Sequence, residues 1–238
     1  MKRKTLNAVL SHAIKLGFSP KTIIDVGVAY GTDGLYGQTE NVDYLLIEPL
    51  QEYESVCQEL TQKYGGDYLL AAAGSKSGEI EINVHPDLSG SSILKESEGS
   101  EIDGTPRMVP IITIDEVVQD KQYKGPFLIK LDTQGTELDI LEGAKATLDN
   151  TELIFLEVSL IEFYRGSPLC ADVFEFMTEN SFVLYDVFGG AYRPLDGALG
   201  QIDFAFCKAN SPLRSSTHWA TPEQRTEITR NRINQLNP

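Results

Sequence analysis

Apolar runs rich in branched side chains alternate along the chain with segments whose apolar positions recur at helical spacing. The strand-like runs are, in chain order, KTIIDVGV (21–28), DYLLIEPL (43–50), DYLLAAAG (67–74), GPFLIKLDTQG (125–135) and TELIFLEVSL (151–160). The helix-like segments are 51–66, the second half of 107–120, 136–150 and 171–181. This alternation predicts an α/β fold with a mostly parallel sheet and helices on both faces.

Four further segments refine this prediction. Residues 78–86 (GEIEINVHP) alternate with period two and read as a half-exposed strand, and the Gly- and Ser-rich residues 89–106 read as a loop or lid. In 107–120 a short strand precedes a helix whose N-cap is Thr113 or Asp115. The runs 182–190 and 202–209 have no helix between them, so we expect them to form an antiparallel edge.

The domain organisation is expected to be simple. Residues 1–20 carry a first helix with Leu6, Val9, Leu10, Ala13 and Ile14 on one face. Residues 21–210 form one domain, and the polar residues 211–238 form a C-terminal extension. No run approaches the ~20 apolar residues of a membrane span, and the basic start lacks the long apolar region of a signal peptide. We therefore expect a cytoplasmic protein.

Composition narrows the choice of partners. The 238 residues carry a formal net charge of −15, and the isoelectric point is about 4.6. An acidic surface repels phosphates, so nucleic acid is not expected as a partner. The three cysteines, Cys57, Cys170 and Cys207, are far apart and form no C-x-x-C pair. They are typical of reduced thiols in a cytosolic protein.

Two motifs at strand ends suggest a nucleoside ligand. The first strand ends in D-x-G-x-x-x-G, formed by Asp25, Gly27 and Gly31. Glycines there would let a ligand cross close to the backbone, although a plain turn would also explain them. Glu48 ends the second strand 21 residues after Gly27, where a carboxylate can accept hydrogen bonds from both hydroxyls of a ribose. The glycine loop and the spaced acid together favour a nucleoside over a structural turn.

A third group of polar residues follows the strand at 125–131. Lys130 and Asp132 interrupt an otherwise apolar run, and buried charges are costly unless they are paired or used. Gln134 and Glu137 fall in the same strand-to-helix turn. Glu137 has an alternative explanation as a charge that complements a helix N-terminus. For Asp132 we favour a function.

The chain resembles the FkbM-type S-adenosylmethionine-dependent methyltransferases in IIDVGVAYG, LLIEP, AAAG, SSIL and especially IKLDTQGTELDILEGA followed by LIFLEV. This resemblance covers roughly residues 21–159 and implies a Rossmann-like class I methyltransferase fold with a seven-stranded sheet. It also implies methylation of a hydroxyl on a small molecule or sugar, a glycan acceptor included. The loop departs from the family at Val28, Ala29 and Tyr30, where members more often carry small polar residues.

The resemblance also assigns roles to individual residues. It places Asp25, Gly27 and Gly31 at the methionine and ribose, Glu48 at the ribose, Ala72 and Ala73 at the adenine, and Asp132 near the reacting end. Pro49 is a further expected cofactor contact. The acceptor hydroxyl must lose a proton, for which the candidate bases are His85, Asp132 and Glu157. A Mg²⁺ ion held by Asp132 and Glu157 is the other route. Candidate acceptor contacts are Ser92, from SSIL, and two loop aromatics, Tyr164 and Tyr192.

Two other function classes stay open at this point. An NAD(P)-dependent oxidoreductase would use a different glycine spacing, and neither a Tyr-x-x-x-Lys pair nor a second domain is evident. A non-catalytic nucleoside-binding module would share every motif described above. Neither the methyl acceptor nor the oligomeric state can be read from the sequence.

Overall fold

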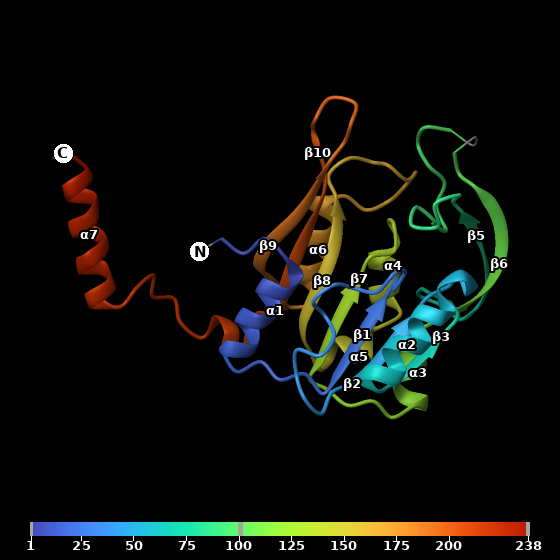
Figure 1. The fold of residues 1–238 in the computed structure, drawn as a ribbon, viewed down its shortest axis with the longest axis horizontal. Helices are drawn as coiled ribbons and strands as arrows, with labels where there is room; N and C mark the ends of the chain where they lie inside the picture. The colour runs from blue at the N-terminus through green and yellow to red at the C-terminus, as the bar shows by residue number, and fades with distance from the viewer. Residues whose placement is uncertain (1, 100–101, 237–238) are drawn as a thin grey trace.

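A seven-stranded sheet forms the centre of the protein in the computed structural model, which describes residues 2–99 and 102–236 (Figure 1). Its strands are β1 (Thr22–Val26), β2 (Asp43–Ile47), β3 (Asp67–Leu69), β7 (Phe127–Leu131), β8 (Thr151–Ser159), β9 (Phe182–Tyr192) and β10 (Leu199–Lys208). They are ordered β3-β2-β1-β7-β8-β10-β9, and β10 runs antiparallel to both of its neighbours. The predicted mostly parallel sheet with an antiparallel edge is confirmed.

Helices cover both faces of this sheet. They are α1 (Leu6–Lys15), α2 (Glu54–Tyr64), α3 (Ile114–Asp120), α4 (Glu137–Glu142), α5 (Lys145–Asp149) and α6 (Cys170–Glu179). The short 3-10 turns η1 (Gln51–Tyr53) and η2 (Pro212–Arg214) and a last helix, α7 (Pro222–Leu236), complete the elements. Successive strand residues point to opposite faces. Ile24 therefore joins the core under α3 to α6, while Ile23 joins the core under α1 and α2. Both cores are apolar, so burial on both faces stabilises the sheet.

The helix starts follow from local capping. The Thr113 side chain accepts a hydrogen bond from the Glu116 N–H, so Thr113 and not Asp115 is the N-cap of α3. Thr5 caps α1 in the same way through Ala8 N–H, and Val9, Leu10 and Ala13 on the predicted face of α1 are buried. The first helix was thus predicted with the correct buried face.

A second, three-stranded sheet corrects one prediction. Residues 67–74 do not form one strand, because β3 ends at Leu69 and β4 (Ala72–Ala73) belongs to another sheet with β5 (Gly78–Val84) and β6 (Thr105–Ile112). The break occurs where the Ala71 N–H donates to the Glu48 carbonyl and draws the chain across the end of β2. β5 confirms the half-exposed strand predicted at 78–86, but its exposure is divided along its length, since its last three residues are buried and its first four are not.

A second correction concerns the helix expected at 136–150, which is two helices, α4 and α5. Gly143 separates them, and a Cβ at this position would lie 2.0 Å from the Gly74 carbonyl oxygen. The close approach of two backbone segments there interrupts the helix. The loop expected at 89–106 has little regular structure before β6 begins at Thr105, although positions 100 and 101 lie outside the described residues.

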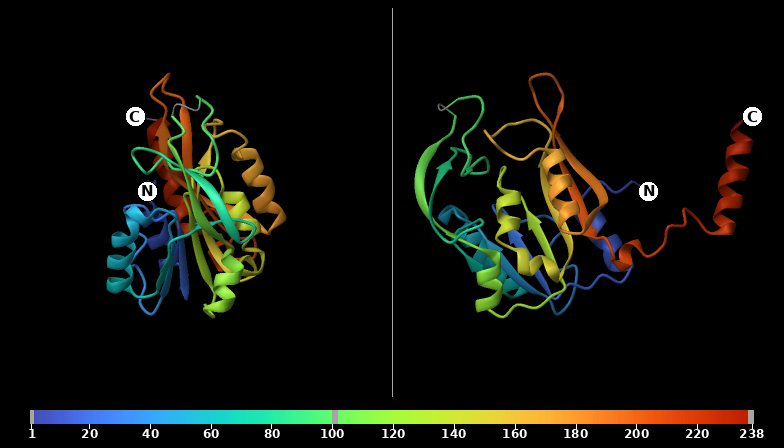
Figure 2. Two further views of the ribbon diagram at one scale, coloured as in Figure 1. Left: turned by 90° about the vertical axis from the view of Figure 1, so that its right-hand side faces the viewer. Right: turned by 180° about the vertical axis from the view of Figure 1, so that it is seen from behind.

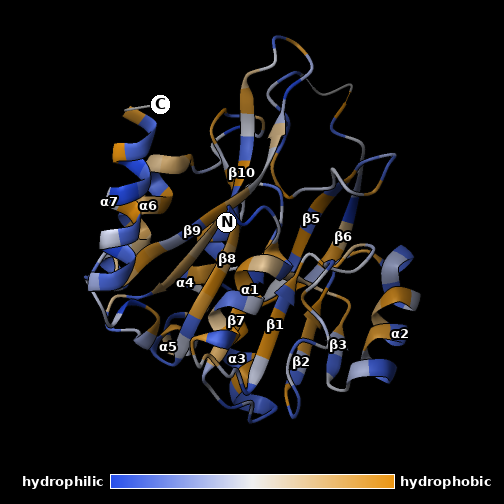
Figure 3. Ribbon diagram, turned by 60° about the vertical axis from the view of Figure 1, so that its left-hand side comes forward, coloured by the Kyte–Doolittle hydropathy of each residue, from blue (hydrophilic) through white to orange (hydrophobic). Residues whose placement is uncertain are grey.

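The C-terminal extension stands apart from the rest of the chain. Figures 1 and 2 show α7 separated from the sheet by an extended segment, and none of its residues is buried. Figure 3 shows hydrophobic residues dominating the central strands and hydrophilic residues dominating α7. Within residues 2–99 and 102–236, no helix combines the length and apolar character that crossing a membrane requires.

Candidate active site

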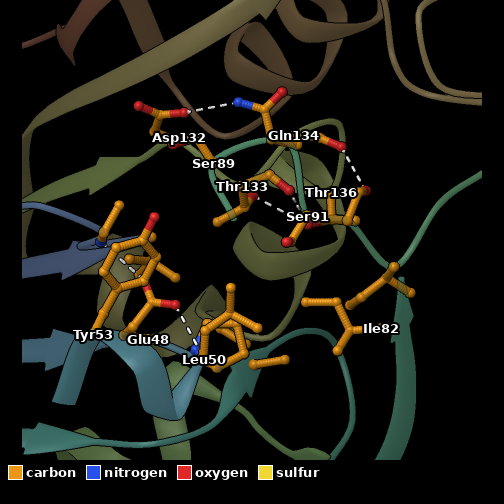
Figure 4. A pocket seen from close by; sticks show the side chains of 18 of the residues that line it. Glu48, Leu50, Tyr53, Ile82, Ser89, Ser91, Asp132, Thr133, Gln134 and Thr136 are labelled. Atoms are coloured by element: carbon orange, nitrogen blue, oxygen red, sulfur yellow. Dashed lines mark hydrogen bonds between the residues drawn. The ribbon is translucent and has the colours of Figure 1, made fainter. Parts of the chain in front are cut away.

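A cavity of about 270 Å³ opens at the carboxyl edge of the sheet, above β1, β2, β7 and β8. Its volume lies near the lower end of the ~300–1,000 Å³ typical of small-molecule sites. Gly27, Glu48, Asp132 and Glu157, which follow or end these four strands, all line it. Residues 88–93 of the loop close it from the other side, as Figure 4 shows in part.

Gly27 brings the backbone of β1 against the turn after β7. Its φ is +76°, and a Cβ there would lie 2.0 Å from the Asp132 carbonyl oxygen. No residue with a side chain fits this position without moving the chain. Gly27 therefore fixes the floor of the cavity, between the predicted cofactor loop and the candidate base.

Asp25 and Gly31 support this loop but are not among the residues that line the cavity. Asp25 is fully buried and accepts hydrogen bonds from Thr32 Oγ1 (2.8 Å) and the Tyr36 hydroxyl. Its Oδ1 is 3.2 Å from Lys130 Nζ. A Cβ added at Gly31 would lie at ordinary contact distance from the Leu60 and Tyr36 side chains. Contact of either residue with a cofactor stays a prediction.

Glu48 lies in the wall of the cavity with 3% of its surface exposed. One carboxylate oxygen accepts the Leu50 N–H and the other accepts the Ala29 N–H, both at 2.9 Å. Burial raises the pKa of Glu48, and the two N–H donors partly offset this rise. The carboxylate is held in one orientation, and each of its oxygens keeps lone-pair capacity for a ligand hydroxyl.

The wall around Glu48 is apolar. Pro49, Ala72 and Ala73, which were predicted as cofactor contacts, line it together with Leu50 and Ile82. A flat aromatic base would bury its faces against such side chains. The three predicted residues therefore belong to an apolar wall that suits a flat base, and their contact with a cofactor stays a prediction.

Two carboxylates meet at the far end of the cavity. Asp132 follows β7 and Glu157 lies near the end of the neighbouring β8, so the two come from adjacent strands as the sequence predicted. Gln134 Nε2 lies 3.4 Å from an Asp132 oxygen and 3.3 Å from a Glu157 oxygen, and Gln201 Nε2 donates to Glu157 at 2.8 Å. Burial and the charge of Asp132 raise the pKa of Glu157 to about 8. The pair is thus arranged to hold a proton near neutral pH.

Lys130 connects this pair to the glycine loop. Its ammonium group is buried, donates to the Gly27 carbonyl at 2.8 Å, and lies 3.8 Å from Asp132. Burial lowers the pKa of Lys130, but the charges of Asp25 and Asp132 outweigh it and leave the pKa raised. The charged residues that interrupt the apolar run of β7 are therefore paired, as the cost of burial requires.

The Glu137 side chain holds the turn after β7 through hydrogen bonds to its backbone. It is buried and accepts hydrogen bonds from the N–H groups of Thr133 (3.0 Å) and Gly135 (3.2 Å). Burial raises its pKa. Its side chain therefore shapes the turn, and Glu137 is not among the residues that line the cavity.

Of the remaining candidate residues, one lines the cavity and three do not. Ser92 lines the cavity and donates its hydroxyl to the Gln134 carbonyl at 2.8 Å. His85, Tyr164 and Tyr192 are not among the lining residues. His85 contacts Asp87, the buried Tyr164 donates to the Gly90 carbonyl, and Tyr192 is 69% exposed on β9. Their proposed roles in catalysis or acceptor binding stay untested.

The sequence reasoning missed several residues of the cavity. Tyr53, Leu88, Ser89 and Thr133 all line it, and none was chosen above as a candidate site residue. Ala29, Leu88 and Gln134 hold φ values of +45°, +67° and +59°, which side chains rarely adopt. Strained backbone of this kind persists where the surrounding structure enforces it, often at functional sites. The sequence carries no signal for it, because none of the three is a glycine or asparagine.

Comparison with known protein families identifies the family of the chain. Residues 25–184, more than half of the chain, match the methyltransferase FkbM domain. The chain belongs to the FkbM methyltransferase family. This FkbM methyltransferase therefore has a class I methyltransferase fold and uses S-adenosylmethionine, as the resemblance implied. No curated protein matches its sequence.

Solved methyltransferases show similar folds at low identity. The magnesium protoporphyrin IX methyltransferase of Synechocystis PCC 6803, solved with bound S-adenosylmethionine, has a TM-score of 0.45 at 9% identity, covering 84% of this chain and 76% of that one. An rRNA methylase from Streptococcus thermophilus has a TM-score of 0.45 at 10% identity, covering 87% and 98%. A precorrin-6y C5,15-methyltransferase from Geobacter metallireducens GS-15 has a TM-score of 0.42 at 9% identity, covering 87% and 93%.

The charges of the cavity fit S-adenosylmethionine. Three carboxylates, Glu48, Asp132 and Glu157, line it, and the lining includes no lysine, arginine or histidine from the described part of the chain. An anionic cavity favours a sulfonium cation and disfavours the pyrophosphate of NAD(P). The donor set fits Mg²⁺ less well. Within residues 2–99 and 102–236, no three His, Cys, Asp or Glu side chains are grouped to hold a metal ion.

Proposed function

We propose that this FkbM methyltransferase methylates a hydroxyl group of an uncharged small molecule or sugar. The observation that carries the proposal is the Asp132–Glu157 pair in the lining of the cavity. A hydroxyl is a poor nucleophile until it loses its proton, so an oxygen acceptor needs a base beside it. A carboxylate pair with a pKa of about 8 on Glu157 supplies one near neutral pH.

Each part of the chain has a distinct task in this proposal. When bound, S-adenosylmethionine supplies a methyl group on a sulfonium. Glu48 and the apolar wall hold the nucleoside, and Gly27 lets it pass close to β1. Asp132 and Glu157 receive the acceptor's proton, and Gln134 and Gln201 fix the orientation of Glu157. Alignment of donor and acceptor contributes up to ~7–11 kcal/mol in favourable cases.

An uncharged acceptor is favoured over RNA or a phosphorylated compound. The carboxylates at the reacting end repel anionic groups, and the net charge of −15 repels a polyphosphate chain. The proposal uses no Mg²⁺, because the Asp132 and Glu157 carboxylates already accept hydrogen bonds from the Gln134 and Gln201 side chains.

Two measurements test the proposal. Calorimetry should show binding of S-adenosylmethionine and S-adenosylhomocysteine and much weaker binding of NAD. Transfer of a labelled methyl group should then be followed with sugars and other polyols, with RNA and with amine acceptors, each with and without a chelator. Methylation of RNA or amines alone would contradict the proposal, and tighter binding of NAD would overturn it. If a chelator abolishes activity and added Mg²⁺ restores it, the reaction depends on a metal ion and the metal route is supported instead.

A further inference from the structure

Tyr53 presents a buried polar group that the proposed function does not yet use. The residue belongs to η1, directly after Glu48, and only 3% of its surface is exposed. Tyr53 lines the cavity, and no group of the described residues meets hydrogen-bond geometry with its buried hydroxyl. The side chains of Tyr30 and Ser89 are its polar neighbours and interact with it electrostatically, but neither reaches that geometry. A phenol hydroxyl buried without a partner is costly, so this one invites a functional explanation.

The position of the Tyr53 ring is fixed from two sides. The Tyr53 N–H donates to the Leu50 carbonyl at 3.0 Å, and the Leu50 N–H donates to Glu48 at 2.9 Å. The ring also packs edge-on against Tyr30 of the glycine loop, with centroids 5.0 Å apart and planes at 78°. The short segment from Glu48 to Tyr53 therefore contributes both side chains to the same part of the cavity wall (Figure 4).

The two groups have complementary hydrogen-bonding chemistry. An ionised carboxylate only accepts, so each ribose hydroxyl that binds Glu48 must donate its proton to it. The oxygen of that hydroxyl then has lone pairs that need a donor. The phenol of Tyr53 is such a donor, and no well-formed hydrogen bond within the described chain engages it.

We infer that Tyr53 is a cofactor-binding residue that donates a hydrogen bond to a ribose hydroxyl of the nucleoside held by Glu48. This inference rests on the proposed placement of the ribose at Glu48. It adds a specificity element, because a ligand without the contacted hydroxyl would leave Tyr53 unpaired when it binds. The chain would thus discriminate ribonucleosides from deoxyribonucleosides at this wall.

The test compares Tyr53→Phe with the unchanged protein. Phenylalanine keeps the ring and its contact with Tyr30 and removes only the hydroxyl. Calorimetry would use S-adenosylhomocysteine and its 2′-deoxy and 3′-deoxy analogues. We expect Tyr53→Phe to bind S-adenosylhomocysteine about 3- to 10-fold more weakly. One of the two deoxy analogues should bind both proteins equally, which identifies the contacted hydroxyl.

Thermal unfolding without ligand separates this role from a structural one. Removing an unpaired hydroxyl should leave the melting temperature of Tyr53→Phe unchanged or raised. The matched control is Tyr123→Phe, which loses a hydrogen bond to Asp67 outside the cavity. The control should melt earlier and bind S-adenosylhomocysteine normally.

Each outcome decides a separate question. Equal affinity of Tyr53→Phe and the unchanged protein for S-adenosylhomocysteine would overturn the inference and leave the proposed function intact. The same loss for all three ligands would also overturn it, since the hydroxyl would then contact another part of the ligand. Failure of the unchanged protein to bind S-adenosylhomocysteine would overturn the inference and the proposed function together.

Discussion

The case for a function of Asp132 rests on its charged neighbours and not on burial. The sequence suggested a carboxylate too costly to keep for folding alone, yet 41% of its side chain is exposed. What the structure adds is its charge beside Glu157 and Lys130. The functional argument for Asp132 therefore rests on charge and geometry at the end of β7.

Replacing Asp132 by asparagine should lower turnover while leaving the protein folded. Loss of general-base catalysis typically costs ~10²–10⁴-fold. Because the charge of Asp132 helps to raise the pKa of Glu157, the midpoint of the pH–rate profile should also move below about 8. Steady-state kinetics across pH check both effects. Near-normal turnover by a folded Asp132→Asn variant would place the chemistry elsewhere, with His85 the next residue to test.

Glu157 makes the stability of the protein depend on pH. Its folded-state pKa of about 8 lies above the ordinary value of 4.5, so the folded state binds the proton more tightly than the unfolded state. The resulting stabilisation is present below about pH 4.5 and is lost as the pH rises through about 8. Glu157→Gln cannot ionise, so it should gain stability relative to the unchanged protein over this interval. Melting temperatures of both proteins from pH 5 to 9 measure the difference, and parallel curves would contradict it.

At the scale of elements, the glycine loop is tested best by a pair of substitutions. Gly27→Ala places a methyl group against the Asp132 carbonyl and strains a φ of +76°. Gly17→Ala strains a φ of +100° with nothing within 4 Å. Each φ alone costs on the order of 1 kcal/mol. Gly27→Ala should therefore melt at a lower temperature than Gly17→Ala and lose S-adenosylmethionine binding, which Gly17→Ala should keep.

Most elements of the fold follow from periodicity, and two departures show its limit. The strands at 21–28 and 43–50 were predictable because branched apolar runs end there in turn residues. The break inside DYLLAAAG was not, because no turn residue marks Leu70 or Ala71. The interruption of 136–150 at Gly143 was equally invisible, because it depends on contact with Gly74, which lies far away in the sequence.

The residues of the cavity also include some that the sequence predicts and some that it does not. Gly27, Glu48, Asp132 and Glu157 were predictable because a parallel sheet brings its strand ends to one edge. Tyr53 and Leu88 come from a turn and a loop whose path depends on tertiary packing. Their chemistry alone gave no reason to choose them over the other tyrosines and leucines of the chain.

At the scale of the whole molecule, the C-terminal extension should be dispensable for folding. No residue of α7 is buried, and Trp219 in the segment before it is 80% exposed. A chain ending at Ser216 keeps the Arg214 hydrogen bond to the Leu184 carbonyl. Its unfolding free energy should differ from that of the full chain by ~0.5 kcal/mol or less. A much larger loss in chemical denaturation would show that the extension belongs to the folded domain.

Both margins of the central sheet are unsuited to strand addition by another chain. β3 has three residues, and its Asp67 side chain is engaged by Lys121 and Tyr123. β9 pairs with β10 through three register shifts. The N-terminal segment lies along β9, where the Lys4 carbonyl accepts the Gly189 N–H and Arg3 forms an ion pair with Asp186. Short, irregular or covered margins block edge-to-edge aggregation. A sheet rich in apolar strands can thereby remain dispersed at high protein concentration.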